Sequence, residues 1–309
     1  MTEVSPQIPG TLQNVGWIIG CLFIATLVAV AGSDQGQTYS SLPLFALCGL
    51  VCFAIQWLAF IPAWIFRTER YFDLTGGLSF LSALAIAACL SSQVSPRSWL
   101  VVLLVGTWAV RLSSFLFLRI RNAGFDRRFV NLKRSYSRFL MTWTLQGLWV
   151  YLTLAPALVV LTGKSHTPIG LLAIGGTLVW GAGFFVEVIA DRQKSEFNAQ
   201  PENRGMFIRS GLWSVCRHPN YFGEILLWLG IGIISIPVLE GGQWATLISP
   251  LFVYVQLTTV SGIPLLEGRE RKKWGDDPEY QNYIARTPAL WPIRTRLSKY
   301  SQSSRWTCV

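Results

Sequence analysis

Long apolar segments, separated by short polar loops, fill most of the sequence and constrain its fold more than any other feature. A helix needs roughly 20 mainly apolar residues to cross the hydrocarbon layer of a membrane. Segments that meet or approach this length lie at residues 14–31, 43–66, 76–92, 98–118, 139–162, 168–190, 220–238 and 244–262. With 51% apolar and only 14% charged residues, the chain does not have the composition of a soluble domain. The sequence therefore predicts an all-α, polytopic membrane helix bundle of seven or eight spans, of which 76–92 is the shortest.

The Lys and Arg residues predict how these spans are oriented. Cytoplasmic loops collect basic residues, and nearly all of the 26 Lys and Arg residues fall on one side of an eight-span arrangement. Both termini are therefore expected in the cytoplasm, with the protein in the endoplasmic reticulum membrane of a eukaryote or the inner membrane of a bacterium. This topology and anionic lipid headgroups account for the net charge of +10. The charge does not imply a nucleic-acid partner.

The cysteines and histidines indicate neither a disulfide framework nor a metal centre. Most of the 6 cysteines lie inside apolar segments, without the spacing of a metal site. The 2 histidines, His166 and His218, are too few for a histidine-rich metal centre. No repeats or low-complexity linkers interrupt the chain. We expect one membrane domain over residues 1–309 that ends in a basic cytoplasmic tail at 294–309.

A dense polar block at residues 211–224 leads directly into the seventh apolar segment. Ionisable groups at that depth are costly and usually functional. Glu187 and Asp191 lie four residues apart, as do Asn220 and Glu224, so each pair shares one face of its helix. We expect the two faces to converge at the cytoplasmic end of the sixth and seventh spans, with the loop between these spans folded between them.

The loop at residues 191–219 has side chains that suit a phosphorylated ligand. Its Arg and Lys residues supply charge for phosphates, Trp213 and Tyr221 offer aromatic faces for stacking, and Asn220 can read a carboxamide. The chain has no G-x-G-x-x-G or Walker fingerprint. A nucleotide would therefore be held by the membrane fold itself rather than by a Rossmann domain.

Several motifs along the chain together carry a family resemblance. In order they are Glu69-Arg-Tyr-Phe-Asp-Leu-Thr-Gly-Gly77, Trp108-Ala-Val-Arg-Leu112, Glu187-Val-Ile-Ala-Asp-Arg-Gln-Lys-Ser-Glu-Phe197, Asn203-Arg-Gly205, Gly211-Leu-Trp-Ser-Val-Cys-Arg-His-Pro-Asn-Tyr-Phe-Gly-Glu224, Gly262-Ile-Pro-Leu-Leu-Glu267 and Tyr280-Gln-Asn-Tyr-Ile-Ala-Arg-Thr-Pro288. Over residues 65–293 the chain resembles the steroid 5-alpha-reductase-like superfamily, of the type found in the C-terminal part of 3-oxo-5-alpha-steroid 4-dehydrogenases. Within it, the chain is most similar to a multispanning branch related to sterol reductases and isoprenylcysteine carboxyl methyltransferases.

The resemblance implies an oxidoreductase that uses NADPH to reduce a carbon-carbon double bond conjugated to a carbonyl, in a hydrophobic sterol-like or polyprenoid-like lipid. The cofactor carries the hydride chemistry, and the protein orients it and polarises the acceptor. Carried over to this sequence, the cofactor site has a ribose and nicotinamide side and a phosphate side. The first holds Asp191, Asn220, Tyr221 and Glu224, the second holds Arg192, Lys194, Arg209, Arg217 and His218, and Asn203 and Trp213 complete the predicted set.

The catalytic candidates implied by the resemblance are Asp73 and Tyr71. Hydride addition builds negative charge on the substrate oxygen, so a proton donor is expected beside it. Tyr71 with Asp73, at the start of the third span, is the nearest match to the Glu and Tyr that serve in steroid reductases. Asp73 can hold a proton if it is buried away from cations. Two other interpretations stay open: Asp73 caps the helix entered at 74–77, and Tyr71 belongs to the aromatic belt of the membrane interface.

Two other functions remain open at the level of the sequence. Isoprenylcysteine carboxyl methyltransferases, which use S-adenosylmethionine, are similar to the chain at Arg217-His-Pro219, at Gly223 and at Glu267 ahead of a Tyr-containing tail. Asp191 with Lys194 favours the reductases. The third possibility is a lipid-binding membrane protein without catalysis. In each case the expected partners are membrane lipids and a hydrophobic small molecule, and the oligomeric state stays open.

Overall fold

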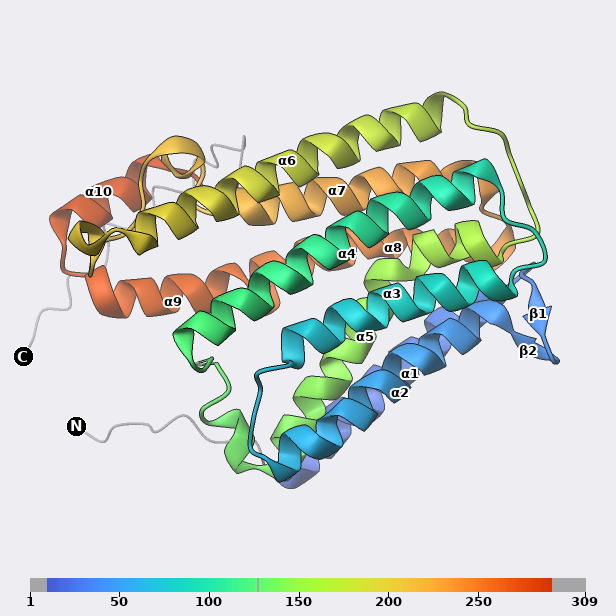
Figure 1. The fold of residues 1–309 in the computed structure, drawn as a ribbon, viewed down its shortest axis with the longest axis horizontal. Coiled ribbons are helices and arrows are strands. Elements are labelled where there is room, and N and C mark those ends of the chain that lie inside the picture. The colour runs from blue at the N-terminus through green and yellow to red at the C-terminus, as the bar shows by residue number, and fades with distance from the viewer. Residues whose placement is uncertain (1–9, 127, 291–309) are drawn as a thin grey trace, which may run out of the picture. The chain divides into compact units, whose positions relative to one another are not determined.

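Long helices make up nearly all of the structure, a computed structural model that describes residues 10–126 and 128–290 (Figure 1). The helices are α1 (Thr11–Ser33), α2 (Leu44–Ile65), α3 (Phe72–Leu90), α4 (Pro96–Ala123), α5 (Tyr136–Thr162), α6 (Leu171–Ala199), α7 (Pro219–Ser235), α8 (Ile248–Val255), α9 (Ile263–Trp274) and α10 (Pro278–Arg286). Two short antiparallel strands, β1 (Thr38–Tyr39) and β2 (Leu42–Pro43), form a hairpin between α1 and α2. The predicted basic tail at 294–309 lies outside the described residues.

Within the described residues, 8 helical segments are long and apolar enough to cross a membrane. Six of them are α1 to α6, of which α4 qualifies over Pro96–Asn122, and the other two are Pro219–Val238 and Gly241–Trp274. The last segment is assembled from a 3₁₀ turn, α8, a π turn and α9. The all-α, polytopic membrane fold predicted from the sequence is therefore confirmed. An even number of crossings returns the chain to the side of the membrane on which it started.

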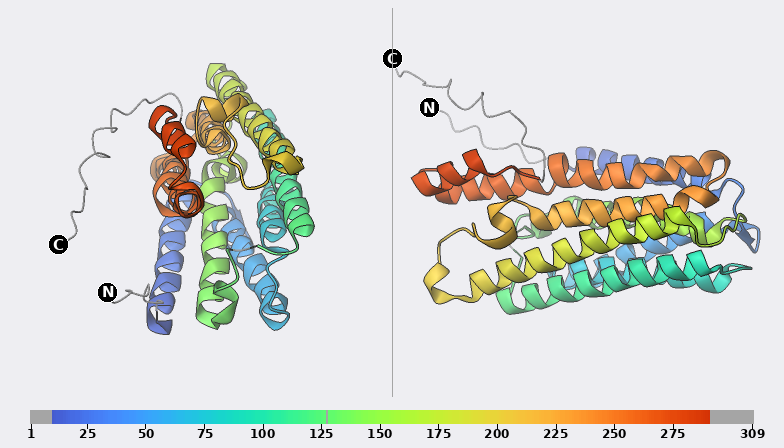
Figure 2. Two further views of the ribbon diagram at one scale, coloured as in Figure 1. Left: turned by 90° about the vertical axis from the view of Figure 1, so that its left-hand side faces the viewer. Right: turned by 90° about the horizontal axis from the view of Figure 1, so that it is seen from above.

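Two element boundaries differ from the prediction, because helix formation continues past the apolar segments. α6 extends to Ala199, so the first part of the predicted 191–219 loop is helical (Figure 2). Ser195 Oγ donates to the Asp191 carbonyl, and Arg192 pairs with Glu196 one turn later, which stabilises this polar end of the helix. Likewise, the chain beyond the predicted eighth span forms α9 and α10.

The chain divides into two compact units. Unit 1 contains the residues up to 177 together with 231–250, and unit 2 contains 178–230 together with the residues from 251 onward. Each unit carries one of the two candidate sites.

α5 is the central helix of unit 1. The helices α1, α2 and α3 pack against it, and it is buried along most of its length. Where α3 crosses α4, a Cβ on Gly77 would lie only 2.4 Å from Cβ of Ser113, so the two helices approach this closely only because position 77 is glycine. Small residues of this kind are typical of helix contacts in membranes.

Arg97, in the first turn of α4, is a buried cation whose hydrogen bonds all go to backbone carbonyls. Its Nη1 donates to Ile234 O at 2.6 Å, its Nη2 to Pro168 O at 2.7 Å and its Nε to Thr167 O at 3.4 Å. Ile234 lies in the last turn of α7, where carbonyls lack a partner within the helix and where positive charge is favourable. Arg97 therefore ties α4 to the end of α7 and to the segment that precedes α6.

We expect Arg97→Ala to lower the free energy of unfolding by at least about 2 kcal/mol, because three carbonyls lose a charged donor and Arg97 is only 2% exposed. Thermal unfolding of the full chain in detergent measures the change. Arg70→Ala is the control, since Arg70 is exposed. Equal losses of stability in the two variants would contradict a structural role for the Arg97 contacts.

Candidate functional site

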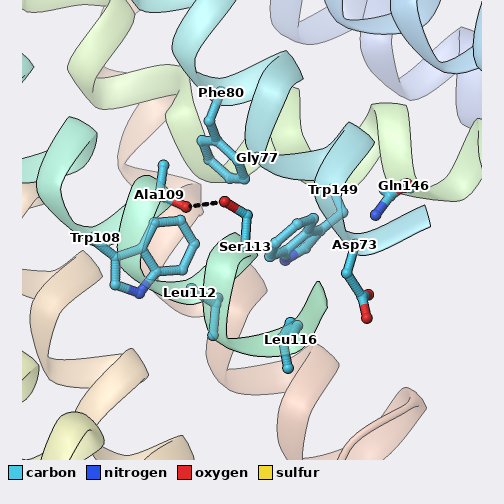
Figure 3. Close-up of a pocket in the computed structure, with 10 residues that line it drawn as sticks. All are labelled: Asp73, Gly77, Phe80, Trp108, Ala109, Leu112, Ser113, Leu116, Gln146 and Trp149. Atoms are coloured by element: carbon cyan, nitrogen blue, oxygen red, sulfur yellow. Dashed lines mark hydrogen bonds between the residues drawn. The ribbon is translucent and has the colours of Figure 1, made fainter. Parts of the chain in front are cut away.

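A pocket in unit 1 lies between α3, α4 and α5 (Figure 3). Its walls are mainly apolar: Phe80, Trp108 and Trp149 form an aromatic cluster, with the Phe80 ring 5.1 Å from Trp108 and 5.2 Å from Trp149, centroid to centroid. The pocket holds about 300 Å³ of empty space, open solvent included. A largely apolar ligand with a small polar group suits these walls.

Asp73 lines this pocket from the first turn of α3. The helix begins at Phe72, and its N-cap is Tyr71, which makes no capping hydrogen bond with its side chain. Asp73 therefore does not cap the helix, because it lies inside the first turn rather than ahead of it. That interpretation of Asp73 is wrong, and its side chain is available to the pocket.

The carboxyl of Asp73 is not isolated from cations, as a protonated Asp73 was expected to be. Arg128 Nη2 lies 3.5 Å from Asp73 Oδ2. The shorter bonds of Arg128 go to Asp126, since its Nε donates to Oδ2 at 2.7 Å and its backbone N–H to Oδ1 at 2.8 Å. Burial alone would raise the pKa of Asp126, but the bonds and charge of Arg128, with the charge of Arg119, lower it. With Asp126 ionised, the three-residue group of Asp73, Asp126 and Arg128 is neutral when Asp73 carries a proton.

Tyr71 is not among the residues that line the pocket. Its ring stacks on Phe117 with the centroids 6.0 Å apart and the planes at 21°, and the residue is 52% exposed. Of the two catalytic candidates, the structure thus brings only Asp73 to the pocket. The position of Tyr71 fits the interfacial aromatic that was the alternative interpretation.

In unit 2, α6 and α7 cross with their backbones in contact. A Cβ on Gly223 would lie 2.6 Å from Gly183 O and 2.7 Å from Glu187 N, and a Cβ on Gly183 would lie 2.5 Å from Gly223 O. A backbone atom inside a helix cannot move aside to make room for an added Cβ, whereas a flexible side chain can. Glycine at both positions is what allows the polar ends of the two helices to meet.

We expect Gly183→Ala to destabilise the chain by about 1–3 kcal/mol, the usual effect of forcing an extra methyl group into a packed contact. The matched control is Gly181→Ala, on the same helix two residues away, where an added Cβ has nothing within 4 Å. Thermal unfolding of both variants tests this. A loss in Gly181→Ala as large as in Gly183→Ala would mean that the change reflects the helix itself and not its crossing with α7.

The polar faces of α6 and α7 converge beyond this crossing, as the sequence predicts. Asn220 Nδ2 donates to Asp191 Oδ1 at 3.3 Å, and Asp191 is only 7% exposed. These two residues are 29 positions apart in the sequence. A buried carboxylate and a carboxamide are therefore held side by side at the start of α7.

In the same unit, Trp213 packs against α6 beside Lys194, which belongs to that helix. Trp213 is buried, its Nε1 donates to Ala190 O at 3.1 Å, and Lys194 Nζ lies 4.4 Å from the centre of a Trp213 ring. Lys194 follows Asp191 by three residues, so both are on one face of the helix. Tyr283 Oη of α10 donates to Trp213 O at 2.6 Å and anchors this turn from the other side.

Arg217 and His218 converge on Glu267 of α9. Arg217 Nη1 lies 3.1 Å and His218 Nε2 3.3 Å from Glu267 Oε1, and Arg271 Nη2 lies 3.7 Å from Oε2. The His218 ring stacks on Tyr221 with the centroids 5.7 Å apart and the planes at 15°. Two side chains predicted to contact phosphates are thus bonded to an acidic residue of α9.

The segment after α10 folds back onto this cluster. The backbone N–H of Arg217 donates to Pro288 O at 2.9 Å, and that of His218 to Ala289 O at 3.1 Å. Tyr280 Oη donates to Glu270 Oε2 at 3.3 Å. Burial, reinforced by the charge of Glu270, raises the pKa of Tyr280 to about 12, so its hydroxyl stays protonated and can donate. The segment from α9 to Ala289, and not only the loop between α6 and α7, therefore builds the candidate site in unit 2.

The remaining predicted cofactor residues are placed less centrally. Arg192 is exposed and pairs with Glu196 at 2.7 Å, and Arg209 is exposed and pairs with Glu279 at 2.9 Å. Asn203 Nδ2 donates to Phe197 O and to Gln200 Oε1, both at 2.9 Å, and so shapes the turn after α6. Glu224 is half-buried on α7, one turn beyond Asn220. The structure does not gather the five predicted phosphate contacts into one cluster.

Three residues contribute to the candidate sites although the sequence did not identify them as site residues. Arg128 lies beside Asp73, Gln146 lines the pocket of unit 1, and Glu267 binds Arg217 and His218. Gln146 carried a signal, since an amide in the middle of an apolar span needs a partner or a ligand. Arg128 and Glu267 carried no comparable signal, because both stand in segments with many other charges.

The similarity of the chain to known proteins covers the residues of both candidate sites. The chain has no match among the curated proteins or the solved structures. One family model matches residues 59–287, which include most of the chain from the end of α2 through α10. The chain belongs to the family described as protein of unknown function (DUF1295).

Proposed function

We propose that the chain is a steroid 5-alpha-reductase-like membrane enzyme that uses NADPH to reduce a carbon-carbon double bond conjugated to a carbonyl in a hydrophobic lipid. The observation that carries the proposal is the hydrogen bond between Asn220 and Asp191. It joins two side chains that the resemblance assigns to the ribose and nicotinamide side of the cofactor.

The donor set in unit 2 fits that side of a dinucleotide. The Asp191 carboxylate accepts hydrogen bonds, as a ribose hydroxyl requires, and the Asn220 carboxamide both donates and accepts, as a nicotinamide carboxamide requires. Lys194 adds a positive charge on the same helix face. The phosphates would have to draw Arg217 and His218 away from Glu267, or share them with it.

The pocket of unit 1 fits the lipid. NADPH supplies the hydride in such a reduction. The protein has to supply a proton as negative charge develops on the substrate oxygen, and Asp73 is the ionisable residue in the pocket wall. The group of Asp73, Asp126 and Arg128 is neutral when Asp73 carries a proton, so a protonated Asp73 leaves no unbalanced charge beside the pocket.

A second candidate is a methyltransferase of the isoprenylcysteine carboxyl methyltransferase type. Arg217 and His218 bond to Glu267, and the segment after α10 pairs with the backbone of both residues. These contacts favour the methyltransferase, because they involve motifs that the chain shares with that group. In this case S-adenosylmethionine, not NADPH, would be the ligand of unit 2. Asp73 would then have no role in proton transfer.

The reductase proposal is tested by incubating the purified full chain with NADPH and a panel of lipophilic enones and enals. The expected result is NADPH oxidation that depends on the conjugated substrate and yields the saturated ketone from an enone or the saturated aldehyde from an enal. Matched ketones that lack the conjugated double bond should cause no oxidation. Transfer of a methyl group from S-adenosylmethionine to a lipid acceptor, with no enone reduction, would replace the first candidate by the second.

A further inference from the structure

Gln146 gives the pocket of unit 1 a polar contact that the proposed proton transfer does not use. It lies on α5, lines the pocket and is 7% exposed. Its Oε1 is buried and accepts no hydrogen bond from the part of the chain that the structure describes. A buried carbonyl oxygen without a donor is unfavourable, and a ligand that supplies the donor removes this cost.

The amide of Gln146 lies next to Asp73 along α3. A Cβ on Gly76 would lie 2.7 Å from Gln146 Nε2, so the amide rests on α3 at Gly76. Gly76 follows Asp73 by three residues and shares its face of the helix. Figure 3 shows Asp73 and Gln146 on the same side of the pocket, away from Phe80 and Trp108. The pocket thus has a polar end, at which the Asp73 carboxyl and the Gln146 amide lie on the same side.

The other polar group of the pocket does not satisfy Gln146. The Ser113 hydroxyl donates to Ala109 O at 2.6 Å, the bond drawn in Figure 3, and its oxygen is left only as an acceptor. The Ser113 hydroxyl therefore offers no donor to Gln146 Oε1. A ligand that fits this end brings a hydrogen-bond donor of its own.

We propose that the pocket binds a neutral lipid whose head carries a hydroxyl next to a carbonyl, with the hydroxyl donating to Gln146 Oε1 and the carbonyl facing Asp73. The carbonyl of this ligand follows from the proposed function, on which this inference rests. The hydroxyl is the new element. An anionic head would face the Asp73 carboxyl, and a charge buried in a membrane span is costly. The apolar part of the lipid lies against Phe80, Trp108 and Trp149.

The test is binding of three single-chain saturated ketones to the full chain in detergent, without NADPH. The probes are a hydroxymethyl ketone, the methoxymethyl ketone that lacks only the donor, and the plain methyl ketone. We expect the hydroxymethyl ketone to bind about tenfold more tightly than the methoxymethyl ketone, the effect of one buried hydrogen bond at the upper end of its usual range. None of the probes has a conjugated double bond, so the result is independent of turnover.

Gln146→Leu should bring the affinities for the hydroxymethyl and methoxymethyl ketones to within about twofold of each other, because no acceptor remains. The matched control is Gln56→Leu. Gln56, on α2, also has a buried Oε1 without a donor among the described residues, but it does not line the pocket, so this variant should keep the preference. If Gln146→Leu does not fold, the three probes on the unmodified chain still decide.

Equal affinity for the hydroxymethyl and methoxymethyl ketones in the unmodified chain would overturn the proposal, and so would a preference that persists in Gln146→Leu. Absence of binding by all three ketones would overturn it as well. A preference for the hydroxyl together with no enone reduction would instead remove the proposed function and leave the lipid site standing.

Discussion

Asp73→Asn should reduce the turnover of a lipophilic enone by about a hundredfold or more and leave the affinity for NADPH unchanged. Asparagine keeps the shape of the side chain but cannot give up a proton, and proton transfer by a positioned side chain contributes roughly 10²–10⁴ in rate. Asp73 is not one of the predicted cofactor residues, so the substitution removes none of the contacts proposed for NADPH. Single-turnover rates and NADPH binding, measured on the same preparation, separate the two effects.

The control for this prediction is Asp126→Asn. It removes a carboxylate that binds the same Arg128 but that does not line the pocket. If Asp73 mattered only as a partner of Arg128, both substitutions would lower the rate alike. We expect Asp126→Asn to lose turnover that a lower pH restores, because Arg128 then favours the ionised form of Asp73, whereas Asp73→Asn has no proton to give at any pH. Unchanged turnover in Asp73→Asn would remove Asp73 from the mechanism.

Asn220→Ala should weaken NADPH binding by about tenfold or more, because Asp191 loses the hydrogen bond from Asn220 and the cofactor loses a carboxamide contact. The dissociation constant of NADPH, measured by titration of the full chain, reports the effect. Asn282→Ala is the matched control: Asn282 is exposed on α10 and should bind NADPH as the unmodified chain does. Unaltered affinity in Asn220→Ala would count against the site in unit 2.

The parts of the fold that follow from hydropathy could be predicted from the sequence. Apolar length alone defines the spans, and the four-residue spacing of polar residues on α6 and α7 predicted that Asp191 and Asn220 would meet. The continuation of α6 to Ala199 could not be predicted in this way, because it depends on helix-forming polar residues that hydropathy treats as loop.

The partners of the charged residues could not be predicted, since they depend on neighbours that are distant in the sequence. The resemblance assigned Arg217 and Arg209 to phosphates mainly from their charge, and in the structure Glu267 and Glu279 lie against them. The pocket was hidden for the same reason. Asp73, Ser113 and Gln146 come from three helices, and their proximity depends on the close crossings at Gly76 and Gly77.

The most direct test of the account is the thermal stability of the purified full chain in detergent with NADPH, NADP or S-adenosylmethionine, because a ligand that binds the folded state raises its melting temperature. For the reductase we expect stabilisation by NADPH and by NADP, reduced in Asn220→Ala, and no stabilisation by S-adenosylmethionine. Stabilisation by S-adenosylmethionine alone would contradict it in favour of a methyltransferase, and no stabilisation by any of the three would contradict it in favour of a lipid-binding protein without a nucleotide cofactor.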